Sequence, residues 1–213
     1  MTDFNIKDLR VSDLRGADLS GLDLYGVDFF CVDLSNTNFT GANLRYANFS
    51  QANLRSANFS RANLYGANLR EAYLRNVSIV NIDLSYVNLT SADLTNAQLS
   101  NVNLHYAYTL NANFKGAILD REKLTKSPIQ IHHLDWPVLI TEGYMRIGCQ
   151  RHTHKEWENF SDEAIAAMSH YALGFWHRWK NNLLDMCKIH AELAQQENIV
   201  YNSMKGNNKE LRV

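Results

Sequence analysis

Large apolar residues recur at every fifth position through the first half of the chain. From Phe4 to Leu119 this position holds Leu, Phe or Ile, with Thr109 as the single exception, so 24 consecutive pentapeptides run without an insertion or deletion. A period of five matches neither the roughly 3.6 residues of an α-helical turn nor the alternation of an ordinary strand. It fits a closed, stacked turn in which each central side chain points into the axis and the backbone bonds to the turns above and below. The pattern therefore predicts a solenoid stabilised by contacts between neighbouring turns.

A different pattern begins after Leu119. Residues 121–135 read as a connector that covers the end of the repeat, and the apolar runs 138–141 and 144–147 flank Glu142 and Gly143 as in a β-hairpin. Thr153 and Glu156 have the spacing of a capping box, and Ser161 is a candidate cap for the next helix. We therefore expect a repeat domain over 1–121, a connector, hairpin and short helix over 122–160, and a long amphipathic helix with a tail over 161–213, bent at Gly174.

The apolar stripe of this long helix is rich in aromatic residues. Part of it is expected to pack on the hairpin, and part is a candidate homodimer interface formed by Ile165, Met168, Phe175, Trp176, Trp179 and Leu183.

Composition indicates an ordered protein with 46% hydrophobic residues and a formal net charge of -1. The first residues lack the basic and apolar regions of a secretory signal, and no stretch approaches a membrane-spanning length, so a cytoplasmic protein without a membrane partner is expected. Three cysteines at unrelated spacings argue against a disulfide framework.

Charge is segregated along the repeat. Residues 1–36 carry seven Asp against three basic residues, a net of -4, whereas residues 37–80 carry five Arg against one Glu, a net of +4. The acidic set precedes the centres of the first seven units and is a candidate partner-binding surface: Asp3, Asp8, Asp13, Asp18, Asp23, Asp28 and Asp33. The alternative is turn chemistry, because Asp and Asn both accept local backbone hydrogen bonds at tight corners and interchange along this chain.

If residues 20 apart stack, Arg15, Arg55 and Arg75 align as a basic stripe with Lys115. About four cations on an otherwise neutral face predict only weak, salt-dependent affinity for nucleic acid, so direct nucleic-acid binding is not expected. Tyrosines align on another face, either as a recognition surface or as a ladder that covers the wall: Tyr25 and Tyr65, with Tyr46, Tyr86 and Tyr106 beside them.

One constellation has the residue types of a chemical site. Cys149, His152 and His154 offer thiolate and imidazole ligands for zinc, with His132 or His133 as a fourth ligand. The alternative is a packing Cys with surface His residues, and a Cys–His nucleophile lacks a recognisable oxyanion hole or orienting group. No phosphate loop or other catalytic motif occurs in the chain, so a non-catalytic protein without a cofactor is expected.

The run GANLR YANFS QANLR SANFS RANLY GANLR, residues 41–70, resembles the pentapeptide-repeat family. The resemblance implies a right-handed quadrilateral β-helix with four pentapeptides per coil, hence six coils and a rod about 30 Å long at the usual strand spacing. Some members of the family are DNA mimics that occupy type II topoisomerases, and members often dimerise through C-terminal helices. Residues 140–157, ITEGYMRIGCQRHTHKEW, are similar to a tail segment of phage and prophage proteins.

Three hypotheses follow for function. The first is a phage-encoded decoy that inhibits a host protein, such as a DNA-binding or defence protein, through its acidic coils. The second is a scaffold whose C-terminal helical module dimerises and binds the partner. The third is a metal-binding or catalytic site around Cys149.

Overall fold

The computed structural model describes residues 14–104, 106–131 and 134–207, with the backbone alone described from residue 197 onward. The chain forms two compact units, Met1–Ser127 and Pro128–Val213. The five-residue pattern ends at Leu119, yet the boundary lies after Ser127. The reason is that β4 (Glu122–Lys123) still pairs, antiparallel, with β3 (Ile118–Leu119) at the end of the repeat.

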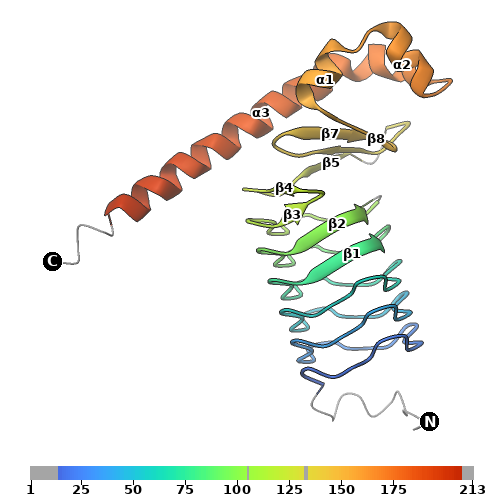
Figure 1. Cartoon of the computed structure of the whole chain (residues 1–213), viewed down its shortest axis with the longest axis vertical. Coiled ribbons are helices and arrows are strands. Elements are labelled where there is room, and N and C mark those ends of the chain that lie inside the picture. The colour runs from blue at the N-terminus through green and yellow to red at the C-terminus, as the bar shows by residue number, and fades with distance from the viewer. Residues whose placement is uncertain (1–13, 105, 132–133, 208–213) are drawn as a thin grey trace. The chain divides into compact units, whose positions relative to one another are not determined.

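The backbone of the repeat unit pairs with itself every 20 residues, which is every four pentapeptides. Asp18 bridges to Asn38, Asn38 to Asn58 and Asn58 to Ser78, all in parallel, and the same offset relates β1 (Ser78–Asp83) to β2 (Gln98–Asn103). Strand β2 then pairs in parallel with β3. Successive turns of chain therefore stack on one another, as the blue-to-green part of Figure 1 shows.

The central residue of each pentapeptide is buried, as the period predicts. Phe29, Phe39, Phe49 and Phe59 are 0% exposed. Phe39 stacks on Phe59 with ring centroids 4.9 Å apart, and Phe29 stacks on Phe49 at 5.1 Å. The interior of this unit is thus filled by close-packed large side chains.

Each pentapeptide turns a corner at the second residue after its centre. This residue has a positive φ at every unit from Gly16 to Gly116, and it is glycine at some corners and Asn, Ser, Gln, Tyr or another residue at the rest. Positive φ is the left-handed region that favours Gly and Asn, so other residues at these corners carry a steric cost.

The second unit begins with a four-stranded antiparallel sheet in the order β5 (Ile129–Ile131), β6 (Val138–Ile140), β7 (Tyr144–Ile147) and β8 (Gln150–Thr153). The predicted hairpin is confirmed as β6 and β7, with Ile140 opposite Met145. Its two outer strands are short, and they turn the hairpin into a sheet.

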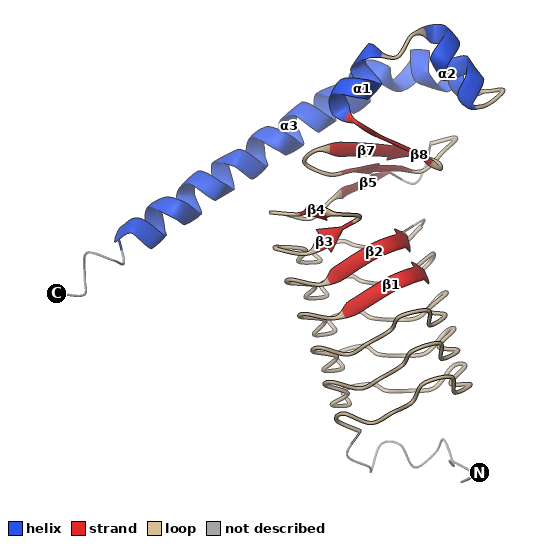
Figure 2. Cartoon of the chain, in the orientation of Figure 1, coloured by secondary structure: helices blue, strands red, loops and turns tan. Residues whose placement is uncertain are grey.

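Three helices follow the sheet, shown in blue in Figure 2: α1 (His154–Asn159), α2 (Asp162–Met168) and α3 (Ala172–Asn207). The capping box is confirmed, because Glu156 N–H donates to Thr153 Oγ1 at 3.2 Å and Thr153 N–H donates to Glu156 Oε2 at 2.7 Å. Ser161 Oγ accepts from Ala164 N–H at 3.3 Å, as predicted for a cap.

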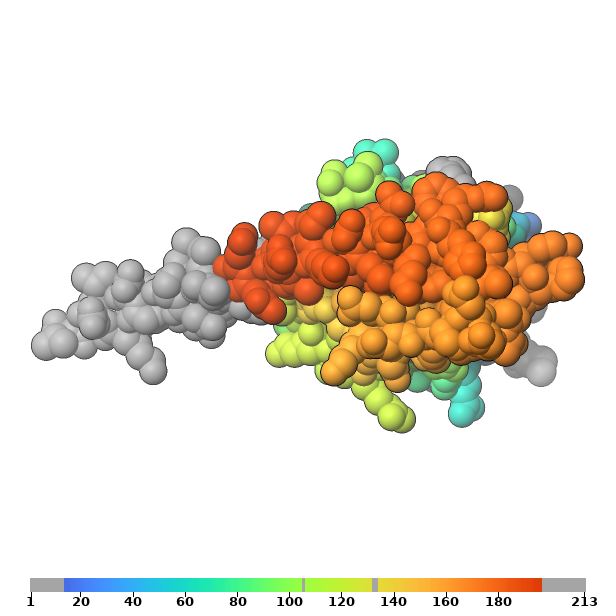
Figure 3. All heavy atoms as spheres, turned by 90° about the horizontal axis from the view of Figure 1, so that it is seen from above, coloured from blue at the N-terminus to red at the C-terminus, as the bar shows by residue number. Residues whose placement is uncertain are grey.

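The long helix predicted from residue 161 is divided in two. Ser169 has an extended backbone, with φ -167° and ψ 154°, and ends α2, whereas Gly174 lies inside α3 without a break. The interruption of the helical run therefore lies at Ser169, five residues before Gly174. Residues on both sides of position 160 share one apolar core that includes Ile140, Met145, Trp157 and Trp176. Figure 3 shows the outer surface of these helices in orange.

Candidate interaction surface

Four of the seven acidic residues predicted to bind a partner lie in the described part of the repeat, and Asp3, Asp8 and Asp13 lie outside it. Among the described residues, each of the four begins a separate column of residues spaced 20 apart, since Asp18, Asp23, Asp28 and Asp33 bridge to Asn38, Asn43, Asn48 and Asn53. We call these four carboxylates the acidic band. They encircle one coil and do not form a row along one face.

The acidic band has a clear structural role. Oδ1 of each Asp accepts the backbone N–H two residues ahead, at 3.0–3.3 Å, and the side-chain amide of the Asn in the next coil, at 2.8–3.0 Å. Asn38 makes the same local bond, accepting Thr40 N–H at 3.1 Å. Turn chemistry thus accounts for Asp and Asn at this position alike.

Two carboxylates of the acidic band are held in the ionised form. Hydrogen bonds from the Ser20 hydroxyl and backbone lower the pKa of Asp18. Burial raises the pKa of Asp33, but hydrogen bonds from Ser35 and Asn53, with the charge of Arg15, outweigh it and leave that pKa lowered. The band therefore carries negative charge at neutral pH.

The predicted basic stripe is partly engaged with neighbouring side chains. Arg75 forms an ion pair with Asp93, and the guanidinium of Arg55 lies 5.8 Å from the ring centroid of Tyr73. Arg15 lowers the pKa of Asp33, as described above. The ion pair with Asp93 offsets the charge of Arg75, whereas the neutral Tyr73 ring leaves the charge of Arg55 in place.

Five tyrosines form a continuous column along one corner of the repeat unit. Ring centroids are 5.6 Å apart for Tyr25–Tyr46, 5.8 Å for Tyr46–Tyr65, 5.3 Å for Tyr65–Tyr86 and 5.1 Å for Tyr86–Tyr106. We call this set the tyrosine column. Tyr25 is 59% exposed and Tyr46 is 48% exposed, so these rings pack on their neighbours and still present much of their surface to solvent, whereas Tyr65 between two of them is partly buried.

The tyrosine column depends on an alternation between two positions at the corner, which are the first and the second residue after the centre of each pentapeptide. Where the first corner residue is Tyr, as at Tyr25 and Tyr65, the second is glycine; where the second is Tyr, as at 46, 86 and 106, the first is another residue. A Cβ on Gly66 would lie 2.6 Å from Cε1 of Tyr46, so this glycine makes room for the ring of the coil before it. Tyr46, Tyr86 and Tyr106 all have positive φ, between 56° and 61°.

Arg45 belongs to the same surface, although sequence reasoning did not single it out. Its guanidinium lies 5.4 Å from the ring centroid of Tyr65 and 5.8 Å from that of Tyr46, within the range of a cation–π contact. The signal was available, because Arg45 fills the first corner position, which Tyr25 and Tyr65 fill in the adjacent coils.

The structure assigns most of the predicted dimerisation residues to the interior of the second unit. Ile165, Phe175, Trp176 and Leu183 are at most 4% exposed and belong to its apolar core, while Met168 and Trp179 are partly buried against that core. Side chains buried within one chain are not available to a second copy. The predicted dimer interface is therefore wrong for Ile165, Phe175, Trp176 and Leu183.

The predicted metal ligands do not come together. Cys149 is exposed in the turn before β8, and the ring of His152 faces Trp157 and Phe160, at 5.1 and 4.8 Å. Among the described residues, no three His, Cys, Asp or Glu side chains are grouped as a metal site; His132 and His133 lie outside them. The zinc prediction is corrected for Cys149, His152 and His154, because they lie on three different elements, the turn before β8, β8 itself and α1, and are not grouped as a metal site.

Within the part of the chain that the structure describes, no helix has both the length and the apolar character needed to span a bilayer.

Several solved structures are similar to the repeat. A pentapeptide repeat protein, Rfr23, from the cyanobacterium Cyanothece 51142 is 30% identical, over 44% of this chain and 65% of that one, with a TM-score of 0.43. HetL, involved in heterocyst differentiation regulation in Nostoc sp. strain PCC 7120, is 35% identical over 50% and 53% of the two chains, with a TM-score of 0.39. QnrB1, a plasmid-mediated fluoroquinolone resistance protein, is 25% identical over 54% and 70%, with a TM-score of 0.34.

The chain spans less than two thirds of the length of the first two of these relatives. No curated protein matches it significantly in sequence. The family model for pentapeptide repeats in eight copies matches residues 2–30, 33–70, 67–105 and 97–121, which is more than half of the chain. With the 20-residue pairing of its backbone, this match shows that the chain belongs to the pentapeptide-repeat family.

Proposed function

We propose that this is a non-catalytic protein-binding protein whose repeat unit, a right-handed quadrilateral β-helix, presents the tyrosine column and Arg45 to a partner protein. The observation that carries the proposal is the placement of three tyrosines at corners with positive φ. A bulky residue in this region costs about 1–2 kcal/mol relative to its ordinary conformation. Asn or Gly occupies the same corner position elsewhere in the repeat, as at Asn76 and Gly26, at lower cost.

Ring stacking compensates for part of this cost. Tyr86 contacts two rings, Tyr65 and Tyr106, and an aromatic pair contributes about 0.5–1.5 kcal/mol beyond area burial. The two terms are of similar size, so ring stacking does little more than offset the backbone cost of tyrosine at this corner. Tyr and Arg are the residue types most enriched among binding hot spots, because they bury much area and carry a polar tip. A half-exposed column of tyrosines with an arginine between them is therefore better suited to a protein interface than to wall covering.

The interior of the repeat supports a role without catalysis. Its central positions are occupied by fully buried Leu and Phe, for example Leu54 and Phe59, which leave no space for a substrate. Function in this unit is thus confined to its outer surface.

DNA-like mimicry by the acidic band is the second candidate. It is favoured by the ionised carboxylates of Asp18 and Asp33. A mimic of a phosphate row needs acidic residues repeated along one face, whereas the column of Asp18 continues with Asn38, Asn58 and Ser78. The decoy hypothesis, with a host protein as target and a phage as source, depends on this second candidate.

Affinity capture from a lysate of the source organism separates the two candidates. Four forms of the full chain are compared: wild type, Tyr46→Asn with Tyr86→Asn, the control Tyr73→Asn, and a variant in which all four residues of the acidic band become Asn. Tyr73 is 48% exposed, like Tyr46, but lies outside the tyrosine column, and Asn is the residue of the adjacent coil at its position.

The proposal predicts a protein recovered with wild type, with Tyr73→Asn and with the acidic-band variant, and lost with the double tyrosine variant. Loss with the acidic-band variant alone would favour mimicry. Recovery with all four forms would place the binding site outside the tyrosine column and contradict the proposal.

A further inference from the structure

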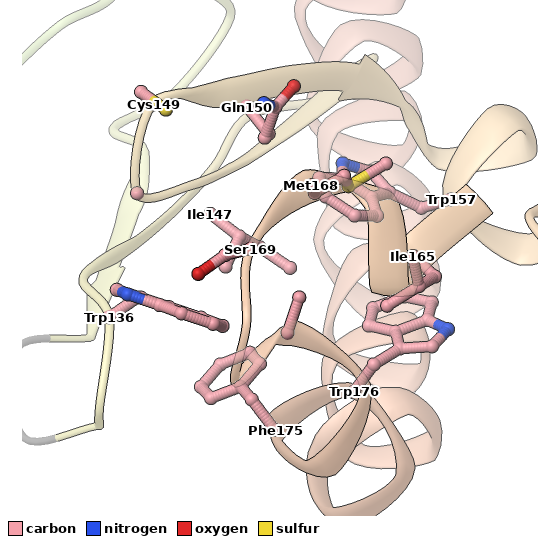
Figure 4. Close-up of a pocket in the computed structure, with 12 residues that line it drawn as sticks. Trp136, Ile147, Cys149, Gln150, Trp157, Ile165, Met168, Ser169, Phe175 and Trp176 are labelled. Atoms are coloured by element: carbon pink, nitrogen blue, oxygen red, sulfur yellow. The ribbon is translucent and has the colours of Figure 1, made fainter. Parts of the chain in front are cut away.

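The second unit contains a cavity of about 340 Å³ that lies between the β7–β8 turn and the three helices. Figure 4 shows Trp136 and Phe175 on one side of it and Trp157, Ile165 and Trp176 on the other. At about 30 Å³ per water molecule, the space would hold roughly ten waters. The space is open to solvent, since Cys149 and Ser169 on its lining are exposed, so it is a surface pocket with mainly apolar walls.

Aromatic rings give the cavity two walls. Trp136 and Phe175 have ring centroids 5.1 Å apart at an angle of 55°, and Trp157 and Trp176 are 5.2 Å apart at 39°. Met168 lies on the lining as well, and its flexible, polarisable side chain adapts to an aromatic surface. These walls favour a flat, apolar occupant.

Polar groups line the cavity beside the apolar walls, and none of the lining residues is charged. Cys149, Gln150 and Ser169 supply a thiol, an amide and a hydroxyl, and Cys149 and Ser169 are exposed. A nearby cation, Lys180, has its Nζ 5.6 Å from the ring centroid of Trp176 but does not line the cavity. An ion taken into such surroundings would lose hydration without gaining a counter-charge, so a neutral molecule is favoured.

We propose that this cavity binds a small neutral aromatic molecule, of one or two fused rings, with a polar substituent directed to Gln150 and Ser169. Its volume falls at the lower end of the range typical of ligand sites, about 300–1,000 Å³. The proposal concerns the second unit and is independent of the partner proposed for the tyrosine column.

The test uses the full chain, with indole as the neutral probe and indole-3-acetate as the same ring with one negative charge. Binding is followed by the ¹H–¹⁵N signals of the tryptophan indole N–H groups. Trp136, Trp157 and Trp176 line the cavity, whereas Trp179 does not and is the internal control. Indole is expected to shift the three lining signals with a Kd below about 1 mM. Indole-3-acetate should bind at least about tenfold more weakly.

Two substitutions test whether indole binds inside this cavity. Ala172 lines the cavity and is buried, so Ala172→Met should fill it and weaken indole binding at least about tenfold. Ala167 is exposed on α2 and does not line the cavity, so Ala167→Met should leave binding unchanged.

Absence of shifts at saturating indole would overturn the proposal, as would binding that Ala172→Met leaves intact in a folded variant. Equal shifts of Trp179 and the lining tryptophans would show non-specific association and would also overturn it.

Discussion

Gly66 provides the sharpest test of how the tyrosine column is built. Gly66→Ala adds a Cβ at φ +66°, 2.6 Å from Cε1 and 2.8 Å from Cδ1 of Tyr46. Gly26 occupies the corresponding position two coils earlier, at φ +64°, with nothing within 4 Å of the added Cβ. Gly26→Ala is therefore a matched control that carries the backbone cost alone.

The expected magnitudes follow from these contacts. Alanine at positive φ costs about 1–2 kcal/mol, and this applies to both variants. Only Gly66→Ala must also displace the Tyr46 ring, which packs against Tyr25 and Tyr65 at 5.6 and 5.8 Å. Loss of these two aromatic pairs, at about 0.5–1.5 kcal/mol each, should lower the free energy of unfolding of Gly66→Ala by about 1–3 kcal/mol more.

Urea unfolding, followed by the far-ultraviolet signal of the repeat unit, measures the difference in free energy of unfolding. A midpoint shift clearly larger for Gly66→Ala than for Gly26→Ala supports the described packing. Equal shifts would refute it, because they would mean that the Tyr46 ring gains nothing from lying over Gly66.

Three further predictions concern other parts of the chain. Phe39→Ala removes a fully buried ring that stacks on Phe59, and it should lower the free energy of unfolding by about 3–5 kcal/mol in the same urea assay. Hydrogen bonds from the Thr153 backbone and hydroxyl lower the pKa of Glu156. This stabilisation is present above the unfolded pKa of about 4.3 and lost as the pH falls through the lowered folded pKa, so Glu156→Gln should flatten the acid limb of a stability–pH curve. Burial raises the pKa of Cys187 to about 12, so mass spectrometry should show iodoacetamide on exposed Cys149 long before Cys187.

The parts of the fold that local chemistry determines could be predicted from the sequence. The five-residue period identifies the buried centres, Glu142 and Gly143 mark the hairpin, and Thr153 with Glu156 marks a helix start, because each depends on residues close in the chain. The break at Ser169 could not be predicted, since apolar residues continue at helical spacing through it. Strand β8 pairs with β7 across the two-residue turn Gly148–Cys149, with Gly148 at φ 57°, and this second hairpin was missed although its signal is local.

The candidate site was predictable only in outline. Alignment at 20 residues places Tyr25 and Tyr65 on one face, two coils apart, but the role of Gly66 depends on where the Tyr46 ring lies, which no spacing reveals. An apolar stripe such as that of Phe175 and Trp176 indicates burial without saying what covers it, and here the same unit covers it. Ligand-like spacing at Cys149 and His152 likewise does not determine the direction in which side chains point.

Hydroxyl-radical footprinting of the full chain, free and bound to the captured partner, shows whether the tyrosine column forms the interface, because it reports the solvent exposure of individual tyrosines. We predict that Tyr25, Tyr46, Tyr86 and Tyr106, which are 37–59% exposed in the chain alone, become protected while Tyr73 remains reactive. Unchanged reactivity of the tyrosine column in the complex, with protection confined to the acidic band or to the second unit, would contradict it.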